Sequence, residues 1–455
     1  MIKCSPRLPL FLGPHLTNAT DGLKSVEVGI SNHGEKQTTV GEKFGSDVNA
    51  NRNSTRKEET PMKKRSNALK ITLWALTAFL CGLAAMAFAQ DKETPKTGHG
   101  AITAEMMAAT QAYWTPERMA NAKPMPLPTV DPAIAAAVSS PLRPAGPARF
   151  SPAGGLPKAS LTTTERSPSE TSEMLNRSDE AIQPTTSPFS YEYPFTNYRP
   201  PVVNAFPYAA VGKLFFVIPA GASEPAGDYV CSASVFNNAY SVITARHCVF
   251  DYATGITYNS WVFYPGYNSG PNAAYGNGWT PNQWITWVSG AATFDYDIAM
   301  FQMHDNNGTG CNGSSGTKPV GDYTSWFGWY YGGDFTERQW DVFGYPAAAP
   351  FAGAHLWQDE AATGAVNPLG YNNVIEIGNP QTGGTSGGPW IIGLNPLSQS
   401  IPAPSNNSTG GGNFINGLNS FKWTSPSHPY SINGPEFEGY NFDNLLTDYN
   451  KLSCP

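Results

Sequence analysis

The C-terminal part of this 455-residue chain has very few basic side chains. Positions 201–455 hold six Lys and Arg against 17 Asp and Glu, whereas positions 1–200 hold 22 basic and 18 acidic residues. Binding to nucleic acid depends on Lys and Arg that neutralise phosphates, so this composition argues against a nucleic-acid partner. Ten of the 12 Trp lie beyond residue 200, and they give the C-terminal part enough apolar surface for a sizeable core.

Long apolar runs are scarce, and the clearest one lies near the N-terminus. It follows Met62-Lys-Lys-Arg, extends from Ile71 to Ala89 and ends in Ala-Phe-Ala before Gln90. This order predicts a cleaved signal peptide over residues 62–89. A membrane anchor is the alternative, but basic residues flank one side only and the run is at the short limit for a span. We expect a secreted, extracellular or periplasmic protein that is free of the membrane after cleavage, with residues 1–61 disordered or an over-extended reading frame.

Cysteine is also scarce, with six residues in the whole chain. Removal of the signal peptide and the residues before it takes away Cys4 and Cys81. The four that remain are Cys231, Cys248, Cys311 and Cys454. An even number in a protein bound for an oxidising compartment predicts disulfide bonds, and four cysteines allow three sets of pairings.

Residues 90–200 lack a sustained apolar pattern and are rich in Pro, Ala, Ser and Thr. Short helices are predicted at Thr103–Ala122 and Asp131–Val138, but such a composition cannot bury enough surface to fold alone. The position between a signal peptide and a folded part predicts a propeptide. A Pro-rich linker without a regulatory role is the alternative.

Helical periodicity is nearly absent after Pro207. Short runs typical of strands alternate with Gly, Pro, Asn and Asp, which predicts an all-β sandwich or barrel arrangement. The first set is 213–218, 229–236, 240–244, 261–264, 284–288 and 298–303, and the second is 339–343, 374–377, 390–393 and 414–421. The stretch Asp305–Pro319 is a candidate connector, and one helix is predicted over Pro435–Leu452.

Three short segments carry candidate catalytic residues, in the order His, Asp, Ser. Val242–Cys248 ends an apolar run with His247, Phe294–Met300 leads from Asp297 into another, and Gly383–Pro389 places Ser386 among glycines. A Ser hydroxyl attacks only when an imidazole takes its proton, and a carboxylate fixes the imidazole tautomer. Asp295 is the rival of Asp297 and is expected to be a solvated turn residue.

The motifs Thr-Ala-x-His-Cys, Asp-Ile-Ala-Met and Gly-x-Ser-Gly-Gly-Pro resemble the signature segments of trypsin/chymotrypsin-like serine proteases. The resemblance covers about residues 205–430, and Phe206–Phe216 and the Val-Cys-Ser-Ala-Ser run from Val230 are most similar to the bacterial secreted branch that includes glutamyl endopeptidases. It implies two antiparallel β-barrels, at 201–305 and 306–455, with the active site between them. The implied function is hydrolysis of peptide bonds through an acyl-enzyme, by a monomer without cofactor or metal.

The same resemblance assigns roles to further residues. The backbone N–H groups of Gly384 and Ser386 would form an oxyanion hole, since Gly tolerates the tight path that such a loop needs. Ser420 and Phe421 are similar to the positions that bind the substrate backbone. A disulfide between Cys231 and Cys248, beside His247, is implied as well, and with it one between Cys311 and Cys454.

Three positions depart from the family pattern. Thr385 stands where trypsin-like zymogens have an Asp that pairs with the new N-terminus, so that activation switch is not predicted. Pro380 replaces the Asp of proteases that prefer Arg or Lys, and Asn419 replaces a His of glutamyl endopeptidases. The sequence therefore leaves activation and substrate preference unassigned.

Two other functions compete with this interpretation. An esterase of the α/β-hydrolase type would need an acid and then a His after Ser386, but no Asp or Glu lies between Ser386 and His428, the only later His. A catalytically inactive, protease-like binding domain is the second alternative. Inactive relatives usually lose a catalytic residue, and this chain keeps all three.

Overall fold

The computed structural model describes residues 94–154, 193–200, 202–272, 275–276, 278–305, 318–395, 412–425 and 427–452. The predicted signal peptide, most of the connector Asp305–Pro319, and both Cys311 and Cys454 lie outside these ranges. Within the described ranges, no helix is long and apolar enough to cross a membrane.

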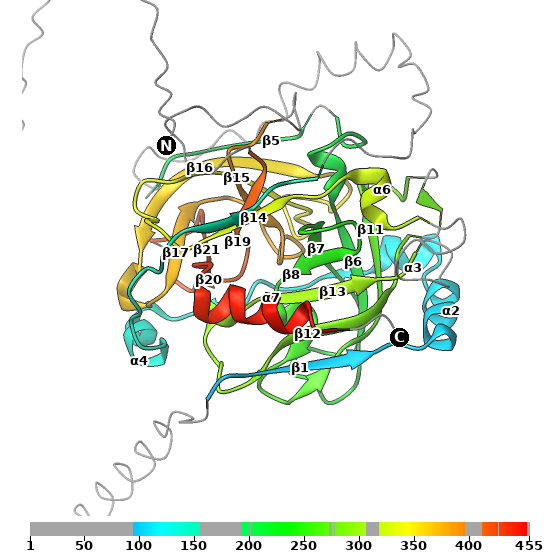
Figure 1. Cartoon of the computed structure of the whole chain (residues 1–455), viewed down its shortest axis with the longest axis horizontal. Coiled ribbons are helices and arrows are strands. Elements are labelled where there is room, and N and C mark those ends of the chain that lie inside the picture. Colours follow the sequence, from blue (N-terminus) through cyan, green and yellow to red (C-terminus); the bar gives the residue numbers. More distant parts are fainter. Residues whose placement is uncertain are drawn as a thin grey trace, which may run out of the picture. The chain divides into compact units, whose positions relative to one another are not determined.

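The first large sheet is drawn mainly in green in Figure 1. Its strand order is β1-β12-β13-β8-β7-β6-β11, with β2 paired to β7. The strands after residue 200 are β6 (Val211–Ile218), β7 (Gly227–Val235), β8 (Ser241–Thr244), β11 (Asn259–Pro265), β12 (Pro281–Ser289) and β13 (Ala299–Met303), beside a small hairpin of β9 (Phe250–Asp251) and β10 (Ile256–Thr257). β6 shows why they form, because its apolar residues are mostly β-branched or aromatic and nearly all are buried.

The second large sheet has the order β21-β17-β16-β15-β18-β19-β14-β4, with β5 paired to β16. Its strands after residue 200 are β14 (Gly328–Tyr331), β15 (Gln339–Gly344), β16 (Trp357–Val366), β17 (Val374–Gly378), β18 (Pro389–Ile392), β19 (Phe414–Leu418) and β21 (Ser431–Pro435), and β20 (Lys422–Trp423) lies beside it. The strand predicted over 414–421 ends at Leu418. The predicted all-β fold of two barrels with a short C-terminal helix is confirmed.

Helices are few and short in the described part after residue 200. They are α6 (Val320–Thr324), a π-helical turn at Gly439–Asp443 and α7 (Asn444–Tyr449), with 3-10 turns at Tyr208–Ala210, Arg246–Cys248, Phe294–Tyr296 and Pro368–Gly370. The C-terminal helix is shorter than the predicted Pro435–Leu452, because β21 extends to Pro435 and reciprocal capping by Glu438 and Asn441 sets the start of the helical region. Tyr449 anchors α7, with its hydroxyl 2.6 Å from Ser241 Oγ in β8.

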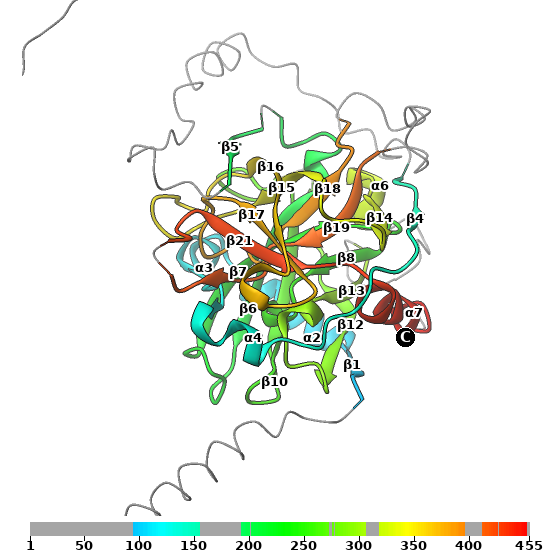
Figure 2. The ribbon, with the colours of Figure 1, turned by 90° about the vertical axis from the view of Figure 1, so that its left-hand side faces the viewer.

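The segment before residue 200 adds strands to both sheets. Its elements are β1 (Lys96–Ala101), α2 (Ala104–Tyr113), α3 (Pro116–Asn121), β2 (Lys123–Pro124), β3 (Thr129–Val130), a 3-10 turn at Pro132–Ile134, α4 (Ala135–Val138), β4 (Arg149–Ser151) and β5 (Phe195–Tyr198). Figures 1 and 2 show the blue and teal chain following the outside of the two sheets. Trp114 anchors it, because its ring lies 5.4 Å from that of Phe215 and its Nε1 donates to the Ser260 carbonyl.

Candidate active site

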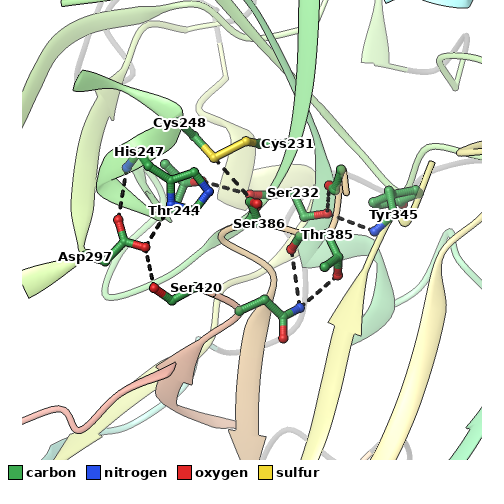
Figure 3. The surroundings of a disulfide bond; sticks show 12 residues. Cys231, Ser232, Thr244, His247, Cys248, Asp297, Tyr345, Thr385, Ser386 and Ser420 are labelled. Atoms are coloured by element: carbon green, nitrogen blue, oxygen red, sulfur yellow. Dashed lines mark hydrogen bonds and ion pairs between the residues drawn. A yellow bond between two sulfur atoms is a disulfide. The ribbon is translucent and has the colours of Figure 1, made fainter. Parts of the chain in front are cut away.

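His247 and Asp297 lie together beyond the ends of two central strands of the first sheet. His247 sits in the 3-10 turn after β8, and Asp297 lies two residues before β13, which pairs with β8. His247 Nδ1 is 2.8 Å from Asp297 Oδ2, and the backbone N–H of His247 donates to Oδ1 at 3.0 Å. Two hydrogen bonds therefore fix the carboxylate against the imidazole and its main chain, as Figure 3 shows.

The Asp297 carboxyl is completely buried. Burial raises the pKa of this carboxyl, but the charge and hydrogen bond of His247, with further contributions from Arg246 and Ser420, outweigh burial and lower the pKa below its ordinary value. An ionised carboxylate only accepts hydrogen bonds, so Nδ1 must carry a proton. In the uncharged imidazole, Nε2 is then the acceptor, which is the state that a general base needs.

Ser386 comes from the second sheet, in the loop just before β18. Ser232 of β7 holds this loop against the first sheet, because its backbone N–H donates to the Ser386 carbonyl at 2.8 Å and its Oγ to the Gly384 carbonyl at 3.0 Å. In Figure 3 the His247 ring lies between Asp297 and Ser386. Ser232 belongs to the Val-Cys-Ser-Ala-Ser run from Val230, but nothing in that run predicts its contact with the Ser386 loop.

Two polar atoms at this point are buried without a hydrogen-bond partner among the described residues. They are Nε2 of His247 and Oγ of Ser386. Buried polar groups are normally paired, and hydrogen bonds between catalytic groups are often long before a substrate binds. The two atoms left over are those between which a proton moves when a Ser nucleophile is activated.

Gly384 provides a backbone donor next to Ser386. Its φ is +93°, and a Cβ at this position would lie 2.8 Å from the Tyr345 carbonyl oxygen, so only Gly fits. Its N–H donates to the carbonyl of Met125 at 2.9 Å. The donor proposed for an oxyanion thus already binds a carbonyl oxygen in this structure, and that oxygen belongs to the segment before residue 200.

Ser420 and Phe421 belong to the second half of the molecule and contact Asp297 and Phe294, respectively, in the first half. Ser420 Oγ donates to Asp297 Oδ2 at 2.5 Å. The Phe421 ring stacks on Phe294 at 4.7 Å and packs with Tyr371 and Trp423 in a small buried cluster. Ser420 therefore supports the carboxylate, a contact that the sequence did not predict.

Replacement of Ser420 by Ala is expected to lower kcat/KM about tenfold, because a hydrogen bond to a charged group contributes roughly 1.5–3 kcal/mol and His247 still binds the carboxylate. The variant should also lose stability. A carboxyl with a lowered pKa stabilises the fold above its unfolded pKa of about 3.9, and that contribution disappears as pH falls. The difference in free energy of unfolding from wild type, measured by urea titration, should therefore be largest above about pH 4 and shrink below it.

Ser427→Ala is the control for Ser420→Ala. Ser427 is an exposed residue whose hydroxyl contacts Ser425, and its replacement should change neither readout. Equal kcat/KM for Ser420→Ala and Ser427→Ala would show that the hydrogen bond to Asp297 has no role in catalysis.

Asp295 is not the solvated turn residue that the sequence predicted. It is completely buried, and its carboxylate accepts hydrogen bonds from Ser140 Oγ at 2.9 Å and from Tyr440 Oη at 3.0 Å. Both partners are distant in the sequence, so the local turn pattern gave no sign of them. None of its hydrogen bonds in the described structure goes to His247.

Two of the three residues that depart from the family pattern, Asn419 and Thr385, are completely buried and hydrogen-bonded to each other. Asn419 donates to the Thr385 hydroxyl at 2.9 Å and to the Phe343 carbonyl at 3.1 Å, and accepts from Trp390 Nε1 at 2.8 Å. Thr385 in turn donates to Gln381. Asn419 and Thr385 therefore hold the loop of Ser386 by hydrogen bonds between uncharged groups. Thr385 stands where the family pattern has an Asp that pairs with a charged N-terminus.

The disulfide between Cys231 and Cys248 is present, and it joins β7 to the turn that carries His247. The second pairing, between Cys311 and Cys454, lies outside the described residues. Across the described ranges, no group of three or more His, Cys, Asp or Glu side chains is placed to hold a metal ion.

No protein-family model matches the sequence, and no curated protein matches it. Several solved structures are similar. A thermostable serine protease from an extremophilic microorganism is 27% identical, with a TM-score of 0.41 over 54% of this chain and 98% of that one. Protease Anisep from Arthrobacter nicotinovorans is 26% identical, with a TM-score of 0.41 over 55% and 98% of the two chains. A Glu endopeptidase is 13% identical, with a TM-score of 0.39 over 56% and 97%.

Proposed function

We propose that the chain is a serine endopeptidase that cleaves protein or peptide substrates. The observation that carries the proposal is the arrangement around His247. Its Nδ1 is bound to the buried carboxylate of Asp297, while its Nε2 and the hydroxyl of Ser386 are both buried and have no hydrogen-bond partner among the described residues. Both atoms are therefore available to each other, and hydrogen bonds between catalytic groups are often long before a substrate binds.

The reaction follows from the roles of these groups. His247 Nε2 takes the proton of Ser386 Oγ as the oxygen attacks the scissile carbonyl, and the Gly384 N–H stabilises the resulting oxyanion. The imidazolium, stabilised by Asp297, returns the proton to the leaving amine, and an acyl-enzyme remains. Water then repeats the sequence with His247 as base, which releases the acid product and restores Ser386.

Secretion and processing belong to the same proposal. The Cys231–Cys248 disulfide is the kind of bond that persists in oxidising compartments, and the N-terminal pattern at 62–89 is that of a signal peptide. We propose export of the protein as a monomeric zymogen, with residues 90–200 as its propeptide. The solved structures that are similar to this chain include a thermostable serine protease, protease Anisep and a Glu endopeptidase.

One observation favours the alternative of an inactive, protease-like binding domain. Ser386 is completely buried, and the Gly384 N–H is already occupied. Covalent labelling with a phosphonylating Ser reagent, followed to completion and mapped by mass spectrometry, separates the two functions. Wild type and Ser427→Ala should be labelled at Ser386, and Ser386→Ala should not be labelled. Equal labelling of wild type and Ser386→Ala would contradict the proposed function.

A further inference from the structure

Residues 123–130 connect the two halves of the molecule through two short strand pairings. β2 pairs with β7 at Tyr229 and Val230, and β3 pairs with β20 at Lys422 and Trp423. Between these pairings the chain passes the Ser386 loop, where a Cβ on Gly383 would lie 2.9 Å from the Met125 carbonyl oxygen. The segment therefore contacts both sheets and the proposed nucleophile loop.

Four main-chain hydrogen bonds outside the two strand ladders hold the segment in this place, in addition to those within the ladders. The Met125 N–H donates to the Val230 carbonyl at 3.0 Å, and its carbonyl accepts from Gly384 N–H at 2.9 Å. The Pro128 and Val130 carbonyls accept from the backbone N–H groups of Lys422 and Thr424, both at 2.9 Å. The carbonyl of Met125 thus occupies the donor that stabilises the oxyanion in the proposed reaction.

Apolar side chains of the segment fill sites on either side of the Ser386 loop. Met125 is 4% exposed and belongs to the main core, and Val130 is buried with Phe421 and Tyr371 in the cluster next to Asp297. Leu127 packs against the core of the second sheet. Proline alternates with these residues at 124, 126 and 128, which restricts the chain to extended conformations before it binds and lowers the entropy lost on docking.

The direction of the segment is opposite to that of a productive substrate. His247 must return its proton to the leaving nitrogen, so the part of a substrate that follows the cleaved bond lies on the His247 side. That side is the side of β7, because Cys248 next to His247 is bonded to Cys231 next to Val230. A substrate therefore runs from β20 to β7, whereas residues 123–130 run from β7 to β20 and pair in parallel with both strands.

We propose that residues 123–130 keep the protease inactive by lying in its substrate cleft in the reverse direction, with the Met125 carbonyl in the oxyanion hole. This inference rests on the proposed function. The reversed direction also explains why Ser386 does not cleave the segment. The bond after the Met125 carbonyl leads to Pro126, whose nitrogen lies toward β20 and away from His247. An adduct at this carbonyl would have no proton donor for its leaving nitrogen, and would return to the starting state.

The inhibition is tested by substitutions within residues 123–130 that weaken the binding of this segment to the rest of the protein. Val130→Asp in the full chain places a charge in the apolar cluster and should release the segment. Ile134→Asp is the matched control, because Ile134 is 50% exposed in the same N-terminal region. The rate of phosphonylation of Ser386 should rise at least about 100-fold in Val130→Asp and stay at the wild-type rate in Ile134→Asp, since four hydrogen bonds and buried apolar groups hold the segment.

Thermal unfolding of each variant shows whether the variant folds. Should Val130→Asp fail to fold, Leu127→Asp replaces it, because Leu127 is only partly buried. Rapid labelling of wild type at the rate of the folded Val130→Asp or Leu127→Asp variant would overturn the inhibition and leave the proposed function standing. If Ser386 reacts in neither variant, and also not after limited proteolysis of the intact wild type, the proposed function fails and the inference fails with it.

The direction of binding has its own test. A segment bound in the substrate direction and protected only by proline would become a substrate when Pro126 is replaced by Ala. In the reversed direction the bond still has no proton donor, so purified Pro126→Ala should remain uncut between residues 125 and 126 in intact-mass spectrometry. Self-cleavage at this bond, absent when Ser386→Ala is added, would overturn the reversed direction.

Discussion

Replacement of Asp297 by Asn is expected to lower kcat for peptide hydrolysis by about 10⁴-fold, the loss typical when the carboxylate of a Ser-His-Asp triad becomes an amide. The cause lies in the hydrogen bond of 2.8 Å to His247 Nδ1. An amide can donate as well as accept, so it allows the tautomer in which Nε2 carries the proton and cannot accept one from Ser386. Kinetics on a peptide substrate, with the protein released from its N-terminal segment, measure the effect.

Asp295→Asn is the matched control for Asp297→Asn. Both carboxylates are completely buried and both accept hydrogen bonds from hydroxyl groups, but those of Asp295 come from Ser140 and Tyr440. Asp295→Asn should keep kcat within about tenfold of wild type, because the pairing of His247 with Asp297 is untouched. A loss of kcat in Asp295→Asn as large as that in Asp297→Asn would mean that the role of the carboxylate has been assigned to the wrong residue.

The arrangement of His247 and Asp297 is of a kind that local sequence can predict. Each residue lies at the end of an apolar strand, β8 or β13, and the pairing of these strands brings the two ends together. The support of Asp297 by Ser420 and of the Ser386 loop by Ser232 depends on contacts between distant strands. Such contacts have no periodic or motif signal in a single sequence.

Strand β16 shows the same limit in the fold. Its sequence contains Asp359, Glu360 and a run rich in Ala and Gly, which have little tendency to form strands on their own. It becomes a strand because β15 pairs along one edge and β17 and β5 along the other. The tertiary environment therefore decided this element, whereas the apolar strands β6, β7 and β13 followed from composition alone.

The N-terminal segment shows what composition predicts about such a stretch and what it leaves open. Its composition predicts that it does not fold alone, and β2 and β3 are two-residue strands whose partners belong to the rest of the chain. The alternation of proline with Met125 and Leu127 was the available signal for an extended ligand of the cleft. Composition, however, does not reveal which surface receives such a segment or in which direction it lies.

Replacement of Gly384 by Ala is expected to lower kcat by about 10²–10³-fold, the usual effect of losing one oxyanion donor. A Cβ at this position meets the Tyr345 carbonyl at 2.8 Å, and φ of +93° is unfavourable for any residue with a Cβ. The peptide plane must therefore turn, and its N–H no longer points to the carbonyl that it binds. The same change should loosen the N-terminal segment, since Met125 accepts from this N–H.

Gly255→Ala controls for backbone strain, because Gly255 has a φ of +73° and a Cβ there would meet nothing within 4 Å. Both variants should lose some stability in thermal unfolding, as Ala does at positive φ. Only Gly384→Ala should lose kcat, with KM changed less than kcat, because the donor acts on the oxyanion more than on the ground-state carbonyl. A kcat for Gly384→Ala equal to that of Gly255→Ala would exclude Gly384 as the oxyanion donor. The Met125 carbonyl, which binds this N–H, would then not lie in an oxyanion hole.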